Sequence, residues 1–108
     1  MDRRLLLGLA LLLAACGQPL PPERAEYAGH WHGGGMTLVI GTDGQVEYER
    51  REGASTRSVS GPIKEFVGDD FLVGIGPLST RFEVSSRPTR HPDGWRMTVD
   101  GVALSRSP

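Results

Sequence analysis

The 108-residue sequence has little of what many functional sites are built from. It contains one cysteine, Cys16, so no disulfide within the chain can support a small domain. Lys64 is its only lysine, and 12 basic residues against 13 acidic ones leave a net charge of −1. Nucleic-acid-binding domains carry a basic patch and a strongly positive balance, so this composition excludes that class of partner.

Long apolar runs are also missing. The longest, residues 5–15, is far shorter than the about 20 residues that a membrane-spanning helix needs. From residue 28 onward, apolar residues do not recur at helical spacing over a stretch long enough to predict a helix. We expect one small domain whose stability is modest unless a closed sheet or a partner supports it.

The N-terminal stretch is the most specific feature that is present. Arg3-Arg4 precedes the apolar run, which ends in Leu-Ala-Ala-Cys at residues 13–16. A basic start, a short apolar run and small residues before a cut are typical of a secretory signal. Leu-Ala-Ala-Cys closely resembles the lipobox of bacterial lipoproteins. The resemblance implies that residues 1–15 are removed as a signal peptide, that the Cys16 sulfur receives a diacylglyceryl group, and that the new amine is usually acylated.

This resemblance also implies a location. Two or three acyl chains hold a protein on a membrane essentially permanently, whereas one binds only marginally. In lipoproteins of Gram-negative bacteria, an aspartate after the cysteine tends to mark retention in the inner membrane, and this sequence has Gly17 there. We therefore expect an anchor in the inner leaflet of the outer membrane, facing the periplasm. The alternative is an ordinary signal peptide with a chance cysteine, and Arg3-Arg4 only loosely resembles a twin-arginine signal.

Residues 16–27 are predicted to form a lipid-anchored tether. Pro19, Pro21 and Pro22 favour an extended chain, and few residues of this segment are suited to a core. Proline-rich chain extends by about 3.1 Å per residue, so the segment would reach roughly 30 Å from the bilayer. The alternative is that the segment lies loosely on the domain.

Residues 28–108 are predicted to form an all-β domain, an antiparallel meander that makes a small up-and-down barrel or a strongly coiled sheet. Valine and aromatic residues alternate with polar ones, and short turn signals separate the runs. The predicted strands span residues 36–41, 45–51, 56–60, 62–67, 71–75, 80–86, 95–99 and 102–106.

Side-chain parity predicts three hairpins, because residues opposite each other in a sheet share a face. A two-residue turn at Asp100-Gly101 pairs Val99 with Val102. A three-residue loop at 42–44, with a left-handed glycine in a bulge, pairs Ile40 with Val46. A four-residue loop at 76–79 would pair residue 75 with 80, 73 with 82 and 71 with 84.

These registers predict which side chains face inward. The expected inward set is Met36, Leu38, Ile40, Val46, Tyr48, Phe71, Val73, Ile75, Phe82, Val84, Trp95, Met97, Val99, Val102 and Leu104, with Val59, Ile63 and Phe66 as additions.

Gly29-His30-Trp31 resembles the Gly-x-Trp that opens the first strand of lipocalins and related calycin barrels. In those families the tryptophan closes one end of the barrel and an arginine near the end of the last strand packs across it. The resemblance implies that Trp31 plugs the core and that Arg106 stacks on it. A lipocalin is far longer, so we expect a small barrel filled by its own side chains in place of a wide ligand cup.

Residues that could support chemistry are few, and we expect no enzyme and no cofactor. His30 and His32 share one face of a strand and are spaced to chelate a transition metal, with His91 or Asp93 as a third ligand; exposed strand histidines are the alternative. Asp69-Asp70 supplies too few oxygens for calcium, so a solvated turn is expected.

Other motifs are also incomplete. The serines lack a nucleophile elbow, and the glycines at 33–35 open a strand without the helix that a phosphate-binding loop requires.

Three function classes follow from these features. The first is a lipid-anchored, non-catalytic module for interaction with the envelope or for its maintenance, binding a protein or envelope component through a sheet face or edge. The second is a calycin-like barrel that binds a small apolar ligand. The third is an inhibitor of a hydrolase such as lysozyme, a role known for some small bacterial lipoproteins. Candidate interface residues are His30, His32 and residues 90–93 in a predicted long loop, 87–94.

Overall fold

The computed structural model describes residues 18–107 and confirms the all-β class. A short 3-10 helix, η1 (Pro22–Tyr27), precedes nine strands. The strands are β1 (Gly29–Gly33), β2 (Met36–Ile40), β3 (Gln45–Glu52), β4 (Ser55–Val67), β5 (Asp70–Ile75), β6 (Leu78–Phe82), β7 (Val84–His91), β8 (Gly94–Val99) and β9 (Val102–Arg106). Cys16 lies outside the described residues.

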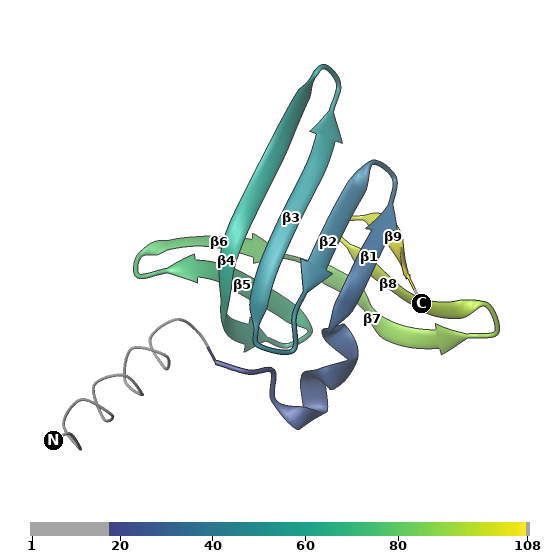
Figure 1. Ribbon diagram of the computed structural model, residues 1–108, viewed down its shortest axis with the longest axis horizontal. Helices are drawn as coiled ribbons and strands as arrows, with labels where there is room; N and C mark the ends of the chain where they lie inside the picture. The colour runs from purple at the N-terminus through teal and green to yellow at the C-terminus, as the bar shows by residue number, and fades with distance from the viewer. Residues whose placement is uncertain (1–17, 108) are drawn as a thin grey trace, which may run out of the picture.

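All nine strands belong to one antiparallel sheet in the order β6-β5-β4-β3-β2-β1-β9-β8-β7. Strand β1 pairs with the last strand, β9, and the edge strands β6 and β7 are separated along the chain by Glu83 alone. The sheet is therefore strongly curled into a half-barrel whose two edges meet at one residue. Figure 1 shows β1, β2 and β3 upright, with β5, β6 and β7 running across them.

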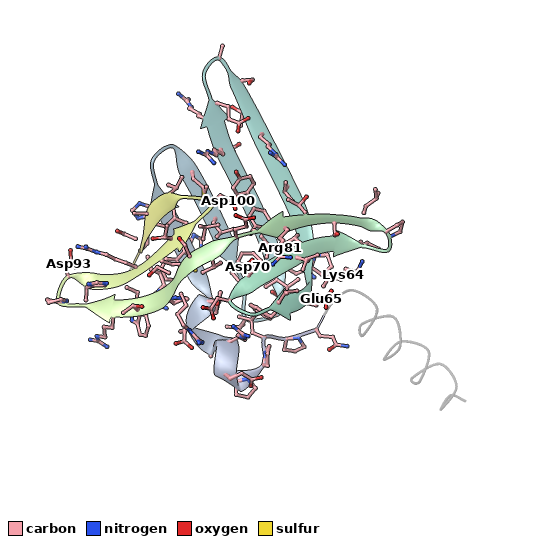
Figure 2. All side chains as sticks on the ribbon, turned by 180° about the vertical axis from the view of Figure 1, so that it is seen from behind. Lys64, Glu65, Asp70, Arg81, Asp93 and Asp100 are labelled. Carbon is pink, nitrogen blue, oxygen red and sulfur yellow. The ribbon has the colours of Figure 1, made fainter. Side chains whose placement is uncertain are left out.

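Two aspartates fix the place where the edges meet, and Figure 2 labels both. The Val84 N–H donates to Asp70 Oδ1 at 2.7 Å, and the Arg81 guanidinium donates to Asp70 Oδ2 at 2.8 Å. On the other side, the Glu83 N–H donates to Asp100 Oδ1 at 2.9 Å, and the Asp100 N–H donates to the Glu83 carbonyl at 2.8 Å. The junction is thus bonded both to β5 and to the β8–β9 turn.

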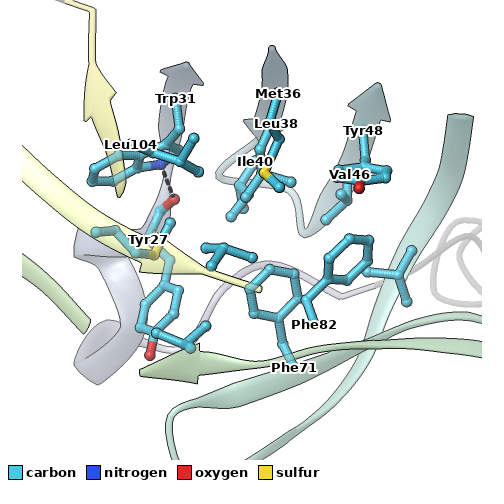
Figure 3. Packing of buried hydrophobic residues seen from close by; sticks show 14 residues of the cluster. Tyr27, Trp31, Met36, Leu38, Ile40, Val46, Tyr48, Phe71, Phe82 and Leu104 are labelled. Atoms are coloured by element: carbon cyan, nitrogen blue, oxygen red, sulfur yellow. Dashed lines mark hydrogen bonds between the residues drawn. The ribbon is translucent and has the colours of Figure 1, made fainter. Parts of the chain in front are cut away.

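The concave side of the curled sheet is filled by fourteen hydrophobic side chains that are 0–6% exposed. Figure 3 shows how Trp31, Leu38 and Ile40 from one part of the sheet face Phe71 and Phe82 from the other. The rings of Phe71 and Phe82 stack with centroids 5.2 Å apart. Residues 18–107 contain no fully buried polar or charged residue, so the core is apolar throughout.

Two of the three predicted hairpins are confirmed. Val99 pairs with Val102 across Asp100-Gly101, whose φ angles of 49° and 79° suit a two-residue turn that needs two left-handed residues. Ile40 pairs with Val46 around the loop that ends in Gly44, whose φ is 83°.

The predicted four-residue loop at 76–79 is wrong. Ile75 pairs with Leu78 across a two-residue turn, Gly76-Pro77. Gly76 has a φ of 61°, as the first position of a type II′ turn requires, and the fixed φ of Pro77 fits the second. The register shifts by two residues, which leaves every side chain on its predicted face. The hairpin nevertheless extends past the core, so Ile75, predicted to be buried, is 73% exposed.

Three further strand boundaries differ from those predicted. The predicted strands 56–60 and 62–67 are one strand, β4, which pairs with β3 up to Pro62 and with β5 from Ile63. The predicted strand 80–86 is divided at Glu83. The predicted loop 87–94 is largely strand, because β7 continues to residue 91 and is an edge strand, where Pro88 removes an N–H at an irregular part of the ladder.

The segment before the sheet packs on the domain, which was the alternative to a free tether. The Leu20 N–H donates to the Thr42 carbonyl at 3.0 Å, and Tyr27 is fully buried although it was assigned to the tether. The Tyr27 hydroxyl donates to the Asp69 carbonyl, and burial, followed by the nearby Asp69 charge, raises the pKa of Tyr27. Among residues 18–107, no helix combines the length and apolar character needed to cross a membrane.

Candidate functional site

The candidate site is built on the pairing of the first and last strands. Trp31 in β1 lies opposite Arg106 in β9, which the curled sheet brings together from opposite ends of the domain. The Trp31 side chain is fully buried, and its Nε1–H donates to the Tyr27 carbonyl at 2.9 Å. This bond, drawn as a dashed line in Figure 3, satisfies the one polar atom of the indole.

Arg106 lies between two tryptophans. Its guanidinium carbon is 5.7 Å from the ring centroid of Trp31 and 4.9 Å from that of Trp95, both within the range of a cation–π contact. Its Nη1 donates to the Ala28 carbonyl at 3.3 Å. The structure therefore places Arg106 on Trp31 as the Gly-x-Trp resemblance implied, and adds Trp95 as a second ring.

Gly29 is required for this arrangement. Its φ of 142° lies in a backbone region that residues other than glycine rarely adopt. A Cβ at this position would lie 2.4 Å from Arg106 Cδ. The glycine of Gly-His-Trp thus leaves room for the arginine that covers the tryptophan.

A surface groove of about 670 Å³ opens beside this stack. We call it the Arg106 groove and define it by His30, Asp93, Trp95 and Arg106, with the buried Ile40 also in its lining. These residues come from β1, the β7–β8 turn, β8 and β9, so the curvature of the sheet assembles the groove. It combines an apolar ring, a cation and an imidazole.

The two charged side chains of the groove, Asp93 and Arg106, differ in their partners. Asp93 bonds to Arg96, and this hydrogen bond, followed by a hydrogen bond from the Asp93 backbone and by the smaller attraction of the Arg96 charge, lowers the pKa of the Asp93 carboxyl. Within residues 18–107, no carboxylate pairs with Arg106, whose polar contact is with a backbone carbonyl. A guanidinium stacked on an indole without an acidic partner is suited to a carboxylate or phosphate group on a ligand.

The two histidines of the predicted metal site, His30 and His32, line two different hollows of the surface. His30 belongs to the Arg106 groove, whereas His32 lines a different hollow of about 440 Å³ with Gly33–Gly35, Glu49 and Arg51. In the part of the chain that the structure describes, no three His, Cys, Asp or Glu residues are grouped as metal ligands would be. The structure therefore does not assemble a third ligand beside the two histidines.

Asp69 and Asp70 are both engaged by protein groups. Asp69 lies 3.7 Å from Arg24 and 3.6 Å from Arg87, and Asp70 accepts bonds from Arg81 and the Val84 N–H. The Val84 N–H, followed by the Arg81 guanidinium, lowers the pKa of Asp70. These carboxylates hold strands and η1 together.

Sequence reasoning missed the role of Trp95 in this site. The sequence predicts that Trp95 faces the core, and the structure shows it packed against the core but only partly buried, so that it also lines the groove. The signal was available, because continuing the predicted pairing of Val99 with Val102 along the two strands places Trp95 opposite Arg106 on the same face.

A scan against protein-family models and searches of curated proteins and of solved structures found no match to this chain.

Proposed function

We propose that the protein is a lipid-anchored lipoprotein of the bacterial envelope, held through Cys16 in the outer membrane and facing the periplasm. The support is the Leu-Ala-Ala-Cys stretch after a short apolar run and a basic start. Residues 20–27 pack on the sheet, so only a few residues separate Cys16 from the folded domain. The domain is therefore held close to the membrane surface.

The domain acts as a non-catalytic interaction module that binds its partner at the Arg106 groove. The observation that carries this proposal is Arg106 itself, a cation that is stacked on Trp95, exposed to a groove and left without a carboxylate among the described residues. Arginine and tryptophan are the residue types that most often dominate binding energy at interfaces. A partner with an exposed carboxylate or phosphate beside an apolar group fits this chemistry.

The two alternatives from the sequence have less support. A calycin-like role requires an interior cavity for an apolar ligand, but fourteen buried side chains occupy the concave side of the sheet. Inhibition of a hydrolase such as lysozyme rests on size and location alone. Lysozyme inhibition by the soluble Cys16→Ser protein tests that role directly.

The test is capture of a partner from native membranes with the acylated protein as bait. The informative variant is His30→Glu, which adds a negative charge to a residue that lines the groove and thereby disfavours an anionic partner there. The matched control is His32→Glu, which makes the same change on the same strand face but in a different hollow. The Cys16→Ser protein, which cannot be lipidated, reports how much capture depends on the membrane.

We expect the His30→Glu protein to lose the partner and the His32→Glu protein to retain it. Equal capture by both variants would show that the groove is not the binding site. Loss of the partner in the His32→Glu protein alone would move the site to the neighbouring hollow.

A further inference from the structure

The tip of the β5–β6 hairpin, residues 75–78, carries two large hydrophobic side chains that the fold does not bury. Ile75 is 73% exposed and Leu78 is 78% exposed, and they are cross-strand neighbours flanking the Gly76-Pro77 turn. Among residues 18–107, Val67 is the other large hydrophobic residue with high exposure, at 40%. Apolar surface is thus concentrated at the tip of one hairpin.

The tip is held in place. Lys64 Nζ donates to the Gly76 carbonyl, and the turn itself contains the fixed ring of Pro77. At the base of the tip, a Cβ on Gly74 would lie 2.0 Å from the Leu78 carbonyl oxygen, which shows how closely the two strands approach. The two side chains are therefore presented outward by a defined turn.

The tip lies close to the start of the described chain. Gln18 lies against the β2–β3 turn, where a Cβ on Gly44 would be 2.1 Å from the Gln18 carbonyl oxygen. Gln18 also lines a small hollow with Lys64 and Glu65, and Lys64 is the residue that bonds the tip. Figure 2 labels both of these β4 residues next to the point where the described chain begins.

Cys16 precedes Gln18 by two residues, which span about 7 Å at most when fully extended. If the sulfur of Cys16 carries lipid, these two residues and the Cys16 side chain are all that separates Gln18 from the lipid group. The β3–β4 hairpin, whose end is charged at Glu49–Glu52, extends away from this side of the molecule in Figure 1.

We propose that the tip, through Ile75 and Leu78, inserts into the interfacial region of the same bilayer that holds Cys16. The inference rests on the proposed lipid anchor. Burial of apolar side chains in the interface is favourable, and a second contact beside the acyl chains fixes the orientation of the domain on the membrane. The charged β3–β4 hairpin then points into the periplasm.

The experiment places an environment-sensitive dye, nitrobenzoxadiazole, on single cysteines introduced into the acylated protein. Leu78→Cys labels the tip, and Ala54→Cys labels the exposed end of the β3–β4 hairpin as the matched control. Both positions are exposed, so neither substitution removes a core side chain. The proteins are reconstituted in vesicles of phosphatidylethanolamine and phosphatidylglycerol, with and without lipids that carry a nitroxide near the headgroup.

We expect dye at position 78 to emit at shorter wavelength and to be quenched by the nitroxide lipid, and dye at position 54 to show neither effect. Equal emission at the two positions would overturn the proposal. A blue shift at position 78 without nitroxide quenching would also overturn it, because the tip would then be covered by protein, such as a second copy of the chain.

The number of dyes per chain separates this inference from the lipid anchor on which it rests. Acylated Cys16 has no free thiol, so each variant takes up one dye. Uptake of two dyes would show a free Cys16 and would overturn the anchor and the membrane contact together. One dye without the spectral changes at position 78 would overturn the membrane contact alone.

Discussion

At the residue scale, the contact between Gly29 and Arg106 decides how the site is built. The absent Cβ of Gly29 makes room for the Arg106 side chain, which in turn covers the buried Trp31. The Gly-x-Trp resemblance suggested the tryptophan and the arginine, but the reason for the glycine is visible only in the folded chain.

Gly29→Ala is expected to lower the free energy of unfolding by about 3 kcal/mol, because it combines a φ of 142° with a collision against Arg106 Cδ. Gly53→Ala is the control. Gly53 also has a positive φ, 64°, but no atom lies within 4 Å of its Cβ position, so only about 1 kcal/mol is expected. Urea unfolding of both variants measures the difference.

The double variant Gly29→Ala with Arg106→Ala isolates the collision from the backbone strain. We expect its loss of stability to be smaller than the sum of the two single losses. Strict additivity would contradict the assignment of Gly29 to a packing role against Arg106.

At the residue scale, the alternation of side chains between the two faces of a strand (their parity) was enough to predict the register of two hairpins. Parity placed Val99 opposite Val102 and Ile40 opposite Val46, because a shift of one residue would turn the apolar side chains to the solvent. It failed for Ile75, because a shift of two residues preserves every face and only the geometry of Gly76-Pro77 distinguishes the two registers. Parity also cannot say where a hairpin leaves the core.

At the scale of elements, Asp70 joins β5 and β6 to β7, which lies at the opposite edge of the sheet. It lies at the start of β5 and accepts bonds from Arg81 in β6 and from the N–H of Val84 in β7. These bonds favour the ionised carboxylate in the folded protein, so the pKa of Asp70 is lower when folded than when unfolded.

A carboxyl with a lowered folded pKa contributes its full stability above the unfolded value, about 4, and loses it as the pH falls through the folded value. Asp70→Asn is therefore expected to cost about 1–2 kcal/mol at neutral pH, with the difference from the wild type shrinking as the pH is lowered from 5 to 2. Urea unfolding as a function of pH measures this.

Asp93→Asn serves as the comparison, because Asp93 pairs with Arg96 on the surface, where solvent screens the interaction. A much smaller effect is expected for it. If the two variants lost the same stability at neutral pH, Asp70 would have no special part in joining β5 to the β6–β7 junction.

The 3-10 helix η1 contributes to the core, which the sequence did not predict. Tyr27 was placed in a tether because proline and charged residues surround it, yet its ring packs edge-on against Phe66 at 5.2 Å and Phe71 at 6.1 Å. The residues next to Tyr27 in the sequence give no indication of its contacts with β4 and β5, which lie about 40 residues further along the chain.

Tyr27→Ala is expected to cost about 3–5 kcal/mol, because it empties a fully buried ring position in the core. Tyr27→Phe keeps the ring and removes only the bond to the Asp69 carbonyl, so about 1 kcal/mol is expected. Thermal unfolding of the two proteins separates these effects. A similar small loss in both would mean that η1 is not part of the folded core.

At the scale of the whole molecule, the sheet is a curled body with a filled interior, and it carries the Arg106 groove and an apolar hairpin tip. The fold class and the order of neighbouring strands followed from the sequence, because alternation and short turns favour a meander. The groove did not, because it depends on how β1, β8 and β9 meet after the sheet has curled.

The central claim is that the sulfur of Cys16 carries lipid and that the mature chain begins there. Mass spectrometry of the chain purified from bacterial membranes tests it most directly. We predict a first residue at position 16 whose mass includes a diacylglyceryl group and, in the usual form, one further acyl chain. A chain with a free thiol at Cys16, or one that retains Met1, would contradict the account.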